Sequence, residues 1–121
     1  MELLAPFQNI KSLILGDNAI GDKGVAVIVS ELTALNKLSL NSNKFKGTAL
    51  KGIAQLEKLK VLDLRNNSLG DDCMVYLAAL KNIAELSLSK NNLTDKGVTT
   101  LAPLTTLAYL DLTTNLVGEG S

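Results

Sequence analysis

Carboxylate, guanidinium and amide side chains are concentrated in residues 59–72, with the sequence LKVLDLRNNSLGDD. Asp63, Asp71 and Asp72 are the side-chain types that bind hard cations such as Ca²⁺ or Mg²⁺. Arg65, the only arginine of the chain, is the type that an arginine finger inserts into a nucleotide hydrolase. Whether residues 59–72 form a site depends on whether the fold brings these side chains to one point.

The residue types needed for most enzyme chemistry are missing from the chain. There is no histidine, and Cys73 is the only cysteine among 121 residues. The chain therefore contains no intrachain disulfide, no Cys/His zinc cluster and no His-based triad. A thiol nucleophile at Cys73 would have no histidine to activate it. We predict no catalytic residue, no cofactor and no metal site, and hence no enzyme.

Charge and hydropathy disfavour two further classes of partner. Lys and Arg number 12, as do Asp and Glu, so no net field attracts the protein to nucleic acid or to an anionic membrane. No apolar run reaches bilayer length, and the first residues, MELLAPFQN, lack the features of a secretory signal. We expect a protein partner, no nucleic acid and no membrane, and a cytoplasmic location.

An internal repeat places the polar stretch in context. The pattern L-x-x-L-x-L-x-x-N-x-L, with other apolar residues at some leucine positions, occurs five times. The copies begin at Ile10, Leu35, Leu59, Ile83 and Leu107, at spacings of 25, 24, 24 and 24 residues. Residues 59–72 are thus one copy of five. A repeat of this period predicts a solenoid.

Each copy contains two kinds of periodicity. The L-x-L core alternates as a strand does, so strands of successive copies can pair in one parallel sheet. After the Asn, the apolar spacing becomes helical, as in Leu50-Ile53-Leu56. We predict strand, loop and helix in every repeat. The extra residue of the first copy lies between Ile28 and Leu32, so its helix should be the longer one.

The repeat resembles the leucine-rich repeat family over essentially the whole chain. The elements GDKGV at 21–25 and LA at 101–102 are similar to helix-bearing bacterial or ribonuclease-inhibitor-like repeats, including the GALA type of some plant-pathogen effectors. The resemblance implies an α/β fold: a right-handed leucine-rich-repeat solenoid, or horseshoe. Its parallel β-sheet lies on the concave face, its helices lie on the convex face, and a ladder of buried Asn side chains joins the repeats.

The repeat boundaries divide a single leucine-rich-repeat domain that covers residues 1–121. They give a partial repeat 1–9, repeats 10–34, 35–58, 59–82 and 83–106, and a partial repeat 107–121. Because terminal repeats of a solenoid need polar caps, we expect a fragment of a longer array, or a protein that self-associates end to end through uncapped ends.

Three columns of the repeat receive structural interpretations. The ladder column holds Asn18, Asn43, Asn67, Asn91 and Asn115, whose amides should bond the loop backbone after each strand. Asp22, Asp71 and Asp95 share a column just before the helices, and we interpret them as N-caps. Cys73 aligns with Gly24, Ala49 and Gly97, which predicts a small buried hydrophobe.

The positions around L-x-L point away from the core and supply the candidate binding surface. It comprises Lys37, Val61, Asp63, Arg65, Glu85, Tyr109 and Asp111. Asp71 and Asp72 lie beyond the loop and should not converge with Asp63 on one ion. Tyr and Arg are enriched among binding hot spots. The alternative is a solvated face whose charges pair with one another.

The function that these observations favour is a noncatalytic protein–protein interaction scaffold that binds through its concave sheet face. The resemblance to bacterial repeats extends this to recognition of host proteins as part of a bacterial effector, which would be delivered into a host cell. One alternative is the substrate-recognition module of a larger enzyme such as a ubiquitin ligase. Another is a regulator of a nucleotide hydrolase that acts through Arg65.

Overall fold

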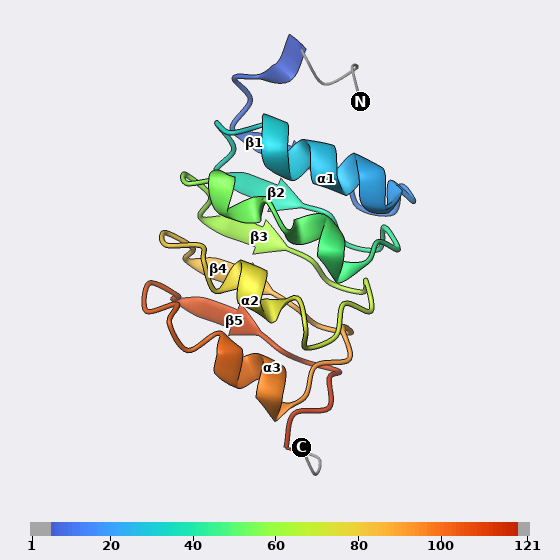
Figure 1. The fold of residues 1–121 in the computed structure, drawn as a ribbon, viewed down its shortest axis with the longest axis vertical. Helices are drawn as coiled ribbons and strands as arrows, with labels where there is room; N and C mark the ends of the chain where they lie inside the picture. Colours follow the sequence, from blue (N-terminus) through green and yellow to red (C-terminus); the bar gives the residue numbers. More distant parts are fainter. Residues whose placement is uncertain (1–5, 119–121) are drawn as a thin grey trace.

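The computed structural model describes residues 6–118, so residues 1–5 and 119–121 of the two predicted partial repeats lie outside the described residues. Within this range the chain forms five parallel strands of three residues each, in sequence order in one sheet (Figure 1). The strands are β1 (Ser12–Ile14), β2 (Lys37–Ser39), β3 (Val61–Asp63), β4 (Glu85–Ser87) and β5 (Tyr109–Asp111). The predicted α/β solenoid is confirmed.

The register of the sheet follows the period of the sequence. The central residues of the strands pair in one row, Leu13 with Leu38, Leu38 with Leu62, Leu62 with Leu86 and Leu86 with Leu110. Because side chains alternate across a strand, this row of leucines points inward and its neighbours point outward. Every outward position is therefore aligned with its counterpart in the next repeat.

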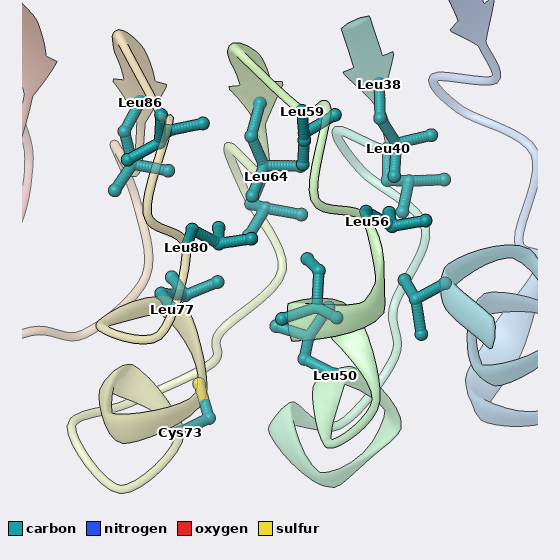
Figure 2. Close-up of a cluster of buried hydrophobic side chains, with 14 of the residues drawn as sticks. Leu38, Leu40, Leu50, Leu56, Leu59, Leu64, Cys73, Leu77, Leu80 and Leu86 are labelled. Atoms are coloured by element: carbon teal, nitrogen blue, oxygen red, sulfur yellow. The ribbon is translucent and has the colours of Figure 1, made fainter. Parts of the chain in front are cut away.

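The core lies between the sheet and the convex segments. Figure 2 shows leucines of the strand side, such as Leu40 and Leu64, and of the convex side, such as Leu50 and Leu77, directed into the same layer. All four are fully buried. Burial of apolar area on this scale is the main stabilising term of the fold. Each repeat contributes one slice of this core.

The convex side carries helices of different kinds. They are α1 (Gly21–Glu31), the 3₁₀ helices η2 (Gly47–Leu50) and η3 (Ile53–Gln55), α2 (Met74–Leu77) and α3 (Asp95–Thr100). The prediction of a longer first helix is confirmed, since α1 has 11 residues while α2 has 4 and α3 has 6. The prediction of one regular helix per repeat is wrong for the second repeat, which forms two short 3₁₀ turns.

The difference in helix type has a geometric reason. A 3₁₀ helix rises about 2.0 Å per residue and an α-helix about 1.5 Å. A repeat that is one residue shorter than the first must cover the same convex width with fewer residues, so part of it extends into 3₁₀ geometry or into turns. The apolar positions keep their burial despite the change, as at Ile53 and Leu56.

The asparagine ladder joins consecutive loops by hydrogen bonds. Asn67 accepts at Oδ1 from the backbone N–H of Asn43 (2.8 Å) and of Lys44 (3.0 Å). Its Nδ2 donates to the carbonyls of Leu40 and Leu64, both at 3.0 Å. Asn43, Asn91 and Asn115 each bond the preceding repeat in the corresponding way. The predicted bonding to the loop backbone is confirmed, and it links neighbouring repeats.

Burial varies along the ladder. Asn43, Asn67 and Asn91 are buried, whereas Asn115 is partly exposed and Asn18 is exposed. The side chain of Asn18 donates only to Leu15 and Gly16 of its own loop. The expectation of a buried amide is therefore wrong for Asn18, because within the described residues no loop of an earlier repeat stacks on it.

Residues beside the ladder positions adopt left-handed backbone conformations. The positive-φ residues other than glycine are Asp17, Ala19, Ser42, Lys44, Asn66, Ser68, Lys90, Asn92 and Thr114. Such conformations are uncommon outside glycine and are maintained where surrounding bonds impose them. They occur twice in each of the first four repeats, directly before and directly after the ladder asparagine, and once beside Asn115. Nothing in the apolar pattern of the sequence marks these positions.

The shared column of Asp22, Asp71 and Asp95 has a different cause from the one predicted. Each carboxylate accepts a backbone N–H of the following repeat: Asp22 from Lys46 (2.6 Å), Asp71 from Thr94 (2.9 Å) and Asp95 from Gly118 (2.7 Å). The residue that caps α3 is Thr94, which accepts from the N–H of Lys96, and no side chain caps α1 or α2. The N-cap interpretation is wrong: these carboxylates tie one repeat to the next.

Candidate functional site

The sheet positions the candidate binding residues in two outward columns. One column runs from Lys37 through Val61 and Glu85 to Tyr109, each paired with the next by strand register. The parallel column contains Asp63 and Asp111, with Ser87 between them. Arg65 follows β3 by two residues. Because neighbouring strands lie about 4.8 Å apart, the predicted residues share one continuous face.

Asp63 and Arg65 form an ion pair on this face. Nε of Arg65 donates to Oδ1 of Asp63 at 2.9 Å and Nη2 donates to Oδ2 at 2.8 Å. The hydrogen bond from Arg65 and the carboxylate charge raise the pKa of the guanidinium. The backbone N–H of Arg65 and the hydroxyl of Ser39 also donate to the Asp63 carboxylate. The alternative prediction, that charges of this face pair with one another, therefore holds for these two residues.

In contrast to Asp63, the carboxylates of Glu85 and Asp111 form no ion pair within the described residues. Within the described residues, the side chain of Glu85 forms no hydrogen bond or ion pair, and it is exposed. Asp111 accepts from the backbone N–H of Thr113 at 3.0 Å. That hydrogen bond, with a smaller contribution from Arg65, lowers the pKa of Asp111. Both carboxylates can therefore attract a cationic group of a partner at neutral pH.

Apolar side chains add to the same face. Tyr109 is 53% exposed and Ile14 is 65% exposed, on the two outer strands of the described sheet. Val61, at the centre of the sheet, is half-buried. Tyr109 stands beside Glu85, its register partner. An aromatic ring next to an open carboxylate is a favourable surface for a protein contact.

The structure separates the polar residues of positions 59–72. Asp63 lies on the sheet face, whereas Asp71 binds Thr94 ahead of α3, on the way to the convex side. In the part of the chain that the structure describes, no group of three or more His, Cys, Asp or Glu side chains is placed to hold a metal ion. The same residues include no helix long and apolar enough to cross a membrane.

Cys73 is buried, as predicted for a small hydrophobe, and is a free cysteine. Burial raises the pKa of its thiol to about 11, so the thiolate that a nucleophile requires is scarce at neutral pH. Figure 2 places Cys73 at the margin of the leucine core. Its environment is that of a packing residue.

Comparisons with known proteins agree on the family. Two family models, each described as leucine-rich repeat, match residues 57–117 and residues 8–29. No curated protein sequence gives a significant match.

Solved structures match across nearly the whole chain. An internalin (InlF) from Listeria monocytogenes is 25% identical with a TM-score of 0.84, over 98% of this chain and 33% of that one. A chain in the mouse RP105/MD-1 complex is 24% identical with a TM-score of 0.72, over 91% of this chain and 19% of that one. The chain thus spans about a third of the length of the internalin and about a fifth of the mouse protein.

Proposed function

Because this chain belongs to the leucine-rich repeat family, whose members generally mediate protein–protein interactions, we propose that it is a noncatalytic scaffold that binds a protein partner through its concave sheet face. The observation that carries this proposal is the continuous outward face of five strands, on which Tyr109 is exposed beside Glu85 and Asp111. The mouse structure that shares the fold is itself of a complex, RP105/MD-1.

One residue of the face has the properties of an interface anchor. Tyrosine contributes a large rigid contact surface, and hot spots cluster where such side chains become buried by the partner. Tyr109 is the residue of the face that best fits this role.

A matched pair of variants tests which face binds. Tyr109 on the sheet and Val75 on α2 are exposed to similar extents, 53% and 57%. A displayed library of natural protein fragments is selected against the purified wild-type chain, and each selected fragment is measured against Tyr109→Ala and Val75→Ala. We expect Tyr109→Ala to weaken binding at least about tenfold, as hot-spot truncations do, and Val75→Ala to leave it unchanged. The reverse result would assign binding to the convex side.

Three narrower roles stay predictions. An effector role and a place in a ubiquitin ligase rest on the resemblance to bacterial repeats, and the full reading frame around residues 1–121 would test both. A hydrolase-regulating role requires Arg65 to leave Asp63, to which it is bound at 2.8 Å. Phosphate release by a candidate GTPase, measured with wild type and Arg65→Ala, tests that role.

End-to-end self-association has one supporting observation. Leu110, Leu116 and Val117, at the β5 side of the described array, are exposed by 37%, 46% and 41%. Sedimentation equilibrium of the wild type and of Leu116→Glu, over a range of concentrations, tests whether this surface joins two copies.

A further inference from the structure

We infer that the concave face is electrically polarised along the solenoid and fits an extended polypeptide segment with acidic residues at one end and basic residues at the other. This inference rests on the proposed function and narrows the chemistry of the partner. The chain as a whole has equal numbers of acidic and basic residues. The polarity therefore comes from the placement of charges and not from their sum.

The basic part of the face lies at the starts of β1, β2 and β3. Lys37 lies in an outward column, and Lys11 and Lys60, which directly precede the first residues of β1 and β3, are exposed at the rim beside it. The backbone N–H of Lys37 donates to the carbonyl of Lys11 at 3.0 Å, and the N–H of Lys60 donates to the carbonyl of Asn36 at 2.8 Å. These bonds bring the three lysine positions together across three adjacent strands. Within the described residues none of the three forms an ion pair.

The acidic part lies on β4 and β5. The positions that correspond to Lys37 are Glu85 and Tyr109, and those that correspond to Lys60 are Ala84 and Ala108, so no lysine stands at the starts of these two strands. Asp111 adds a second carboxylate one outward position further along β5. A cationic group of a partner placed here would lie near both carboxylates and beside the Tyr109 side chain.

The centre of the face separates the two parts without adding free charge. Both oxygens of Asp63 already accept hydrogen bonds, from Arg65 and Ser39, and the Asp63–Arg65 pair is neutral as a unit. Asp17 and Lys90 carry the opposite sign to their halves, but both lie in the loops that follow the strands, at the other rim. At the strand starts, the exposed lysines of β1 to β3 are therefore followed directly by the carboxylate of Glu85 on β4.

The spacing between strands determines how far apart the acidic and basic side chains of the partner must lie. Lys37 and Glu85 are two strands apart, about 10 Å, and an extended chain advances about 3.3 Å per residue. A segment that crosses the strands would therefore place its acidic and basic side chains about three residues apart. A segment with alternating charges would bring like charges together on both halves of the face.

Two labelled peptides of identical composition test this inference. In the block peptide, two glutamates and two arginines are separated by about three neutral residues, to match the strand spacing. In the isomer, the same charges alternate. Fluorescence anisotropy at low salt measures the affinity of each peptide for the full chain and for Lys37→Glu, Glu85→Lys and Lys51→Glu. Lys51 is an exposed residue beside η2 and serves as the convex control.

We expect the wild type to bind the block peptide about three- to tenfold more tightly than the isomer, and salt to reduce the difference, as for exposed charge pairs. Lys37→Glu and Glu85→Lys should each remove the preference, while Lys51→Glu keeps it. Equal binding of the two peptides, or binding of neither, overturns the inference. Concentration-dependent dimerisation that Lys37→Glu abolishes would also overturn the inference, because the face would then bind a second copy of this chain. None of these outcomes affects the Tyr109 test of the proposed function.

Discussion

Gly47 lies directly against Cys73 of the next repeat: a Cβ on Gly47 would overlap the Cβ of Cys73 and lie 2.7 Å from its Sγ. The same contact occurs in reverse between Asp71 and Gly97, where a Cβ on Gly97 would overlap Oδ1 of Asp71. The column of Gly47 and Asp71 therefore packs against the column of Cys73 and Gly97 of the next repeat. In each of these two contacts a larger side chain faces a glycine. Of the four complete repeats, only the second, which precedes the repeat of Cys73, has a glycine and not an aspartate in the column of Asp22, Asp71 and Asp95.

The Gly47–Cys73 contact predicts a cost for Gly47→Ala. The added methyl group has no room beside Cys73, so we expect a loss of about 1–3 kcal/mol in the free energy of unfolding, as for other overpacked cores. Urea denaturation measures the loss. In a Cys73→Gly background, which recreates the small residue of Gly24 and Gly97, the same substitution should cost much less.

Gly52→Ala provides the control for this prediction. A Cβ at Gly52 would have its nearest atom, Nε2 of Gln55, at 3.5 Å, which is ordinary contact. We expect this variant to change stability by no more than about 0.5 kcal/mol. If Gly47→Ala and Gly52→Ala cost the same amount, the contact with Cys73 has no energetic importance.

The ladder predicts a large effect at Asn67 and a small one at Asn18. Asn67→Ala leaves the N–H groups of Asn43 and Lys44 without their acceptor, and it removes one of the two amide donors to each of the Leu40 and Leu64 carbonyls. Because an unpaired buried polar group costs about 1–3 kcal/mol, we expect a total loss of about 2–4 kcal/mol after partial rehydration. Asn18 is exposed and donates only within its own loop, so Asn18→Ala should cost less than about 1 kcal/mol. Chemical denaturation of both variants gives the comparison, and similar costs would contradict it.

The carboxylate of Asp71 predicts a dependence of stability on pH. Burial by itself would raise its pKa, but hydrogen bonds from Thr94 and Gly97, with the charge of Lys96, outweigh burial and lower the pKa below the ordinary 3.8. A carboxyl group with a lowered folded pKa stabilises the protein fully above its unfolded pKa and loses this contribution as the pH falls through the folded value. Stability should therefore decrease below about pH 4.

Asp71→Asn isolates this contribution. The amide retains an oxygen that can accept from the N–H of Thr94 but does not titrate. Unfolding midpoints measured from pH 7 to pH 3 should fall less steeply for the variant than for the wild type. Parallel curves would show that Asp71 does not contribute to the acid sensitivity.

Cys73 predicts slow thiol chemistry in the folded protein. With a pKa of about 11 and a buried sulfur, it should react with Ellman's reagent at pH 8 far more slowly than a free thiol in solution. In a denaturing concentration of urea the reaction should reach the normal rate. Rapid labelling of the folded chain would mean that the region around Cys73 opens readily.

Several features could be predicted from the repeat pattern because they depend on one residue type at one period. The buried leucines, the parallel order of the strands and the bonding of Asn67 to the loops belong to this group. The outward position of Tyr109 and Glu85 also follows from alternation along a strand. The repeat pattern does not determine whether these residues form a binding surface.

Other features were missed because they depend on how far one repeat is displaced from the next. The column of Asp71 precedes helical segments, as N-caps do, yet its partner is 23 residues away at Thr94. The ion pair of Asp63 and Arg65 was one of two alternatives that the sequence left open, because it depends on rotamers that no spacing specifies.

The sequence by itself determined the solenoid, its core and its ladder, because contacts between identical residues at a fixed period are the same in every copy. The tertiary structure alone decided which convex segments become α-helices or 3₁₀ helices, which N–H each aspartate accepts, and which charges of the sheet face stay free. The physical reason is that these outcomes depend on contacts between unlike residues in stacked repeats about 4.8 Å apart, where a small offset changes the partner.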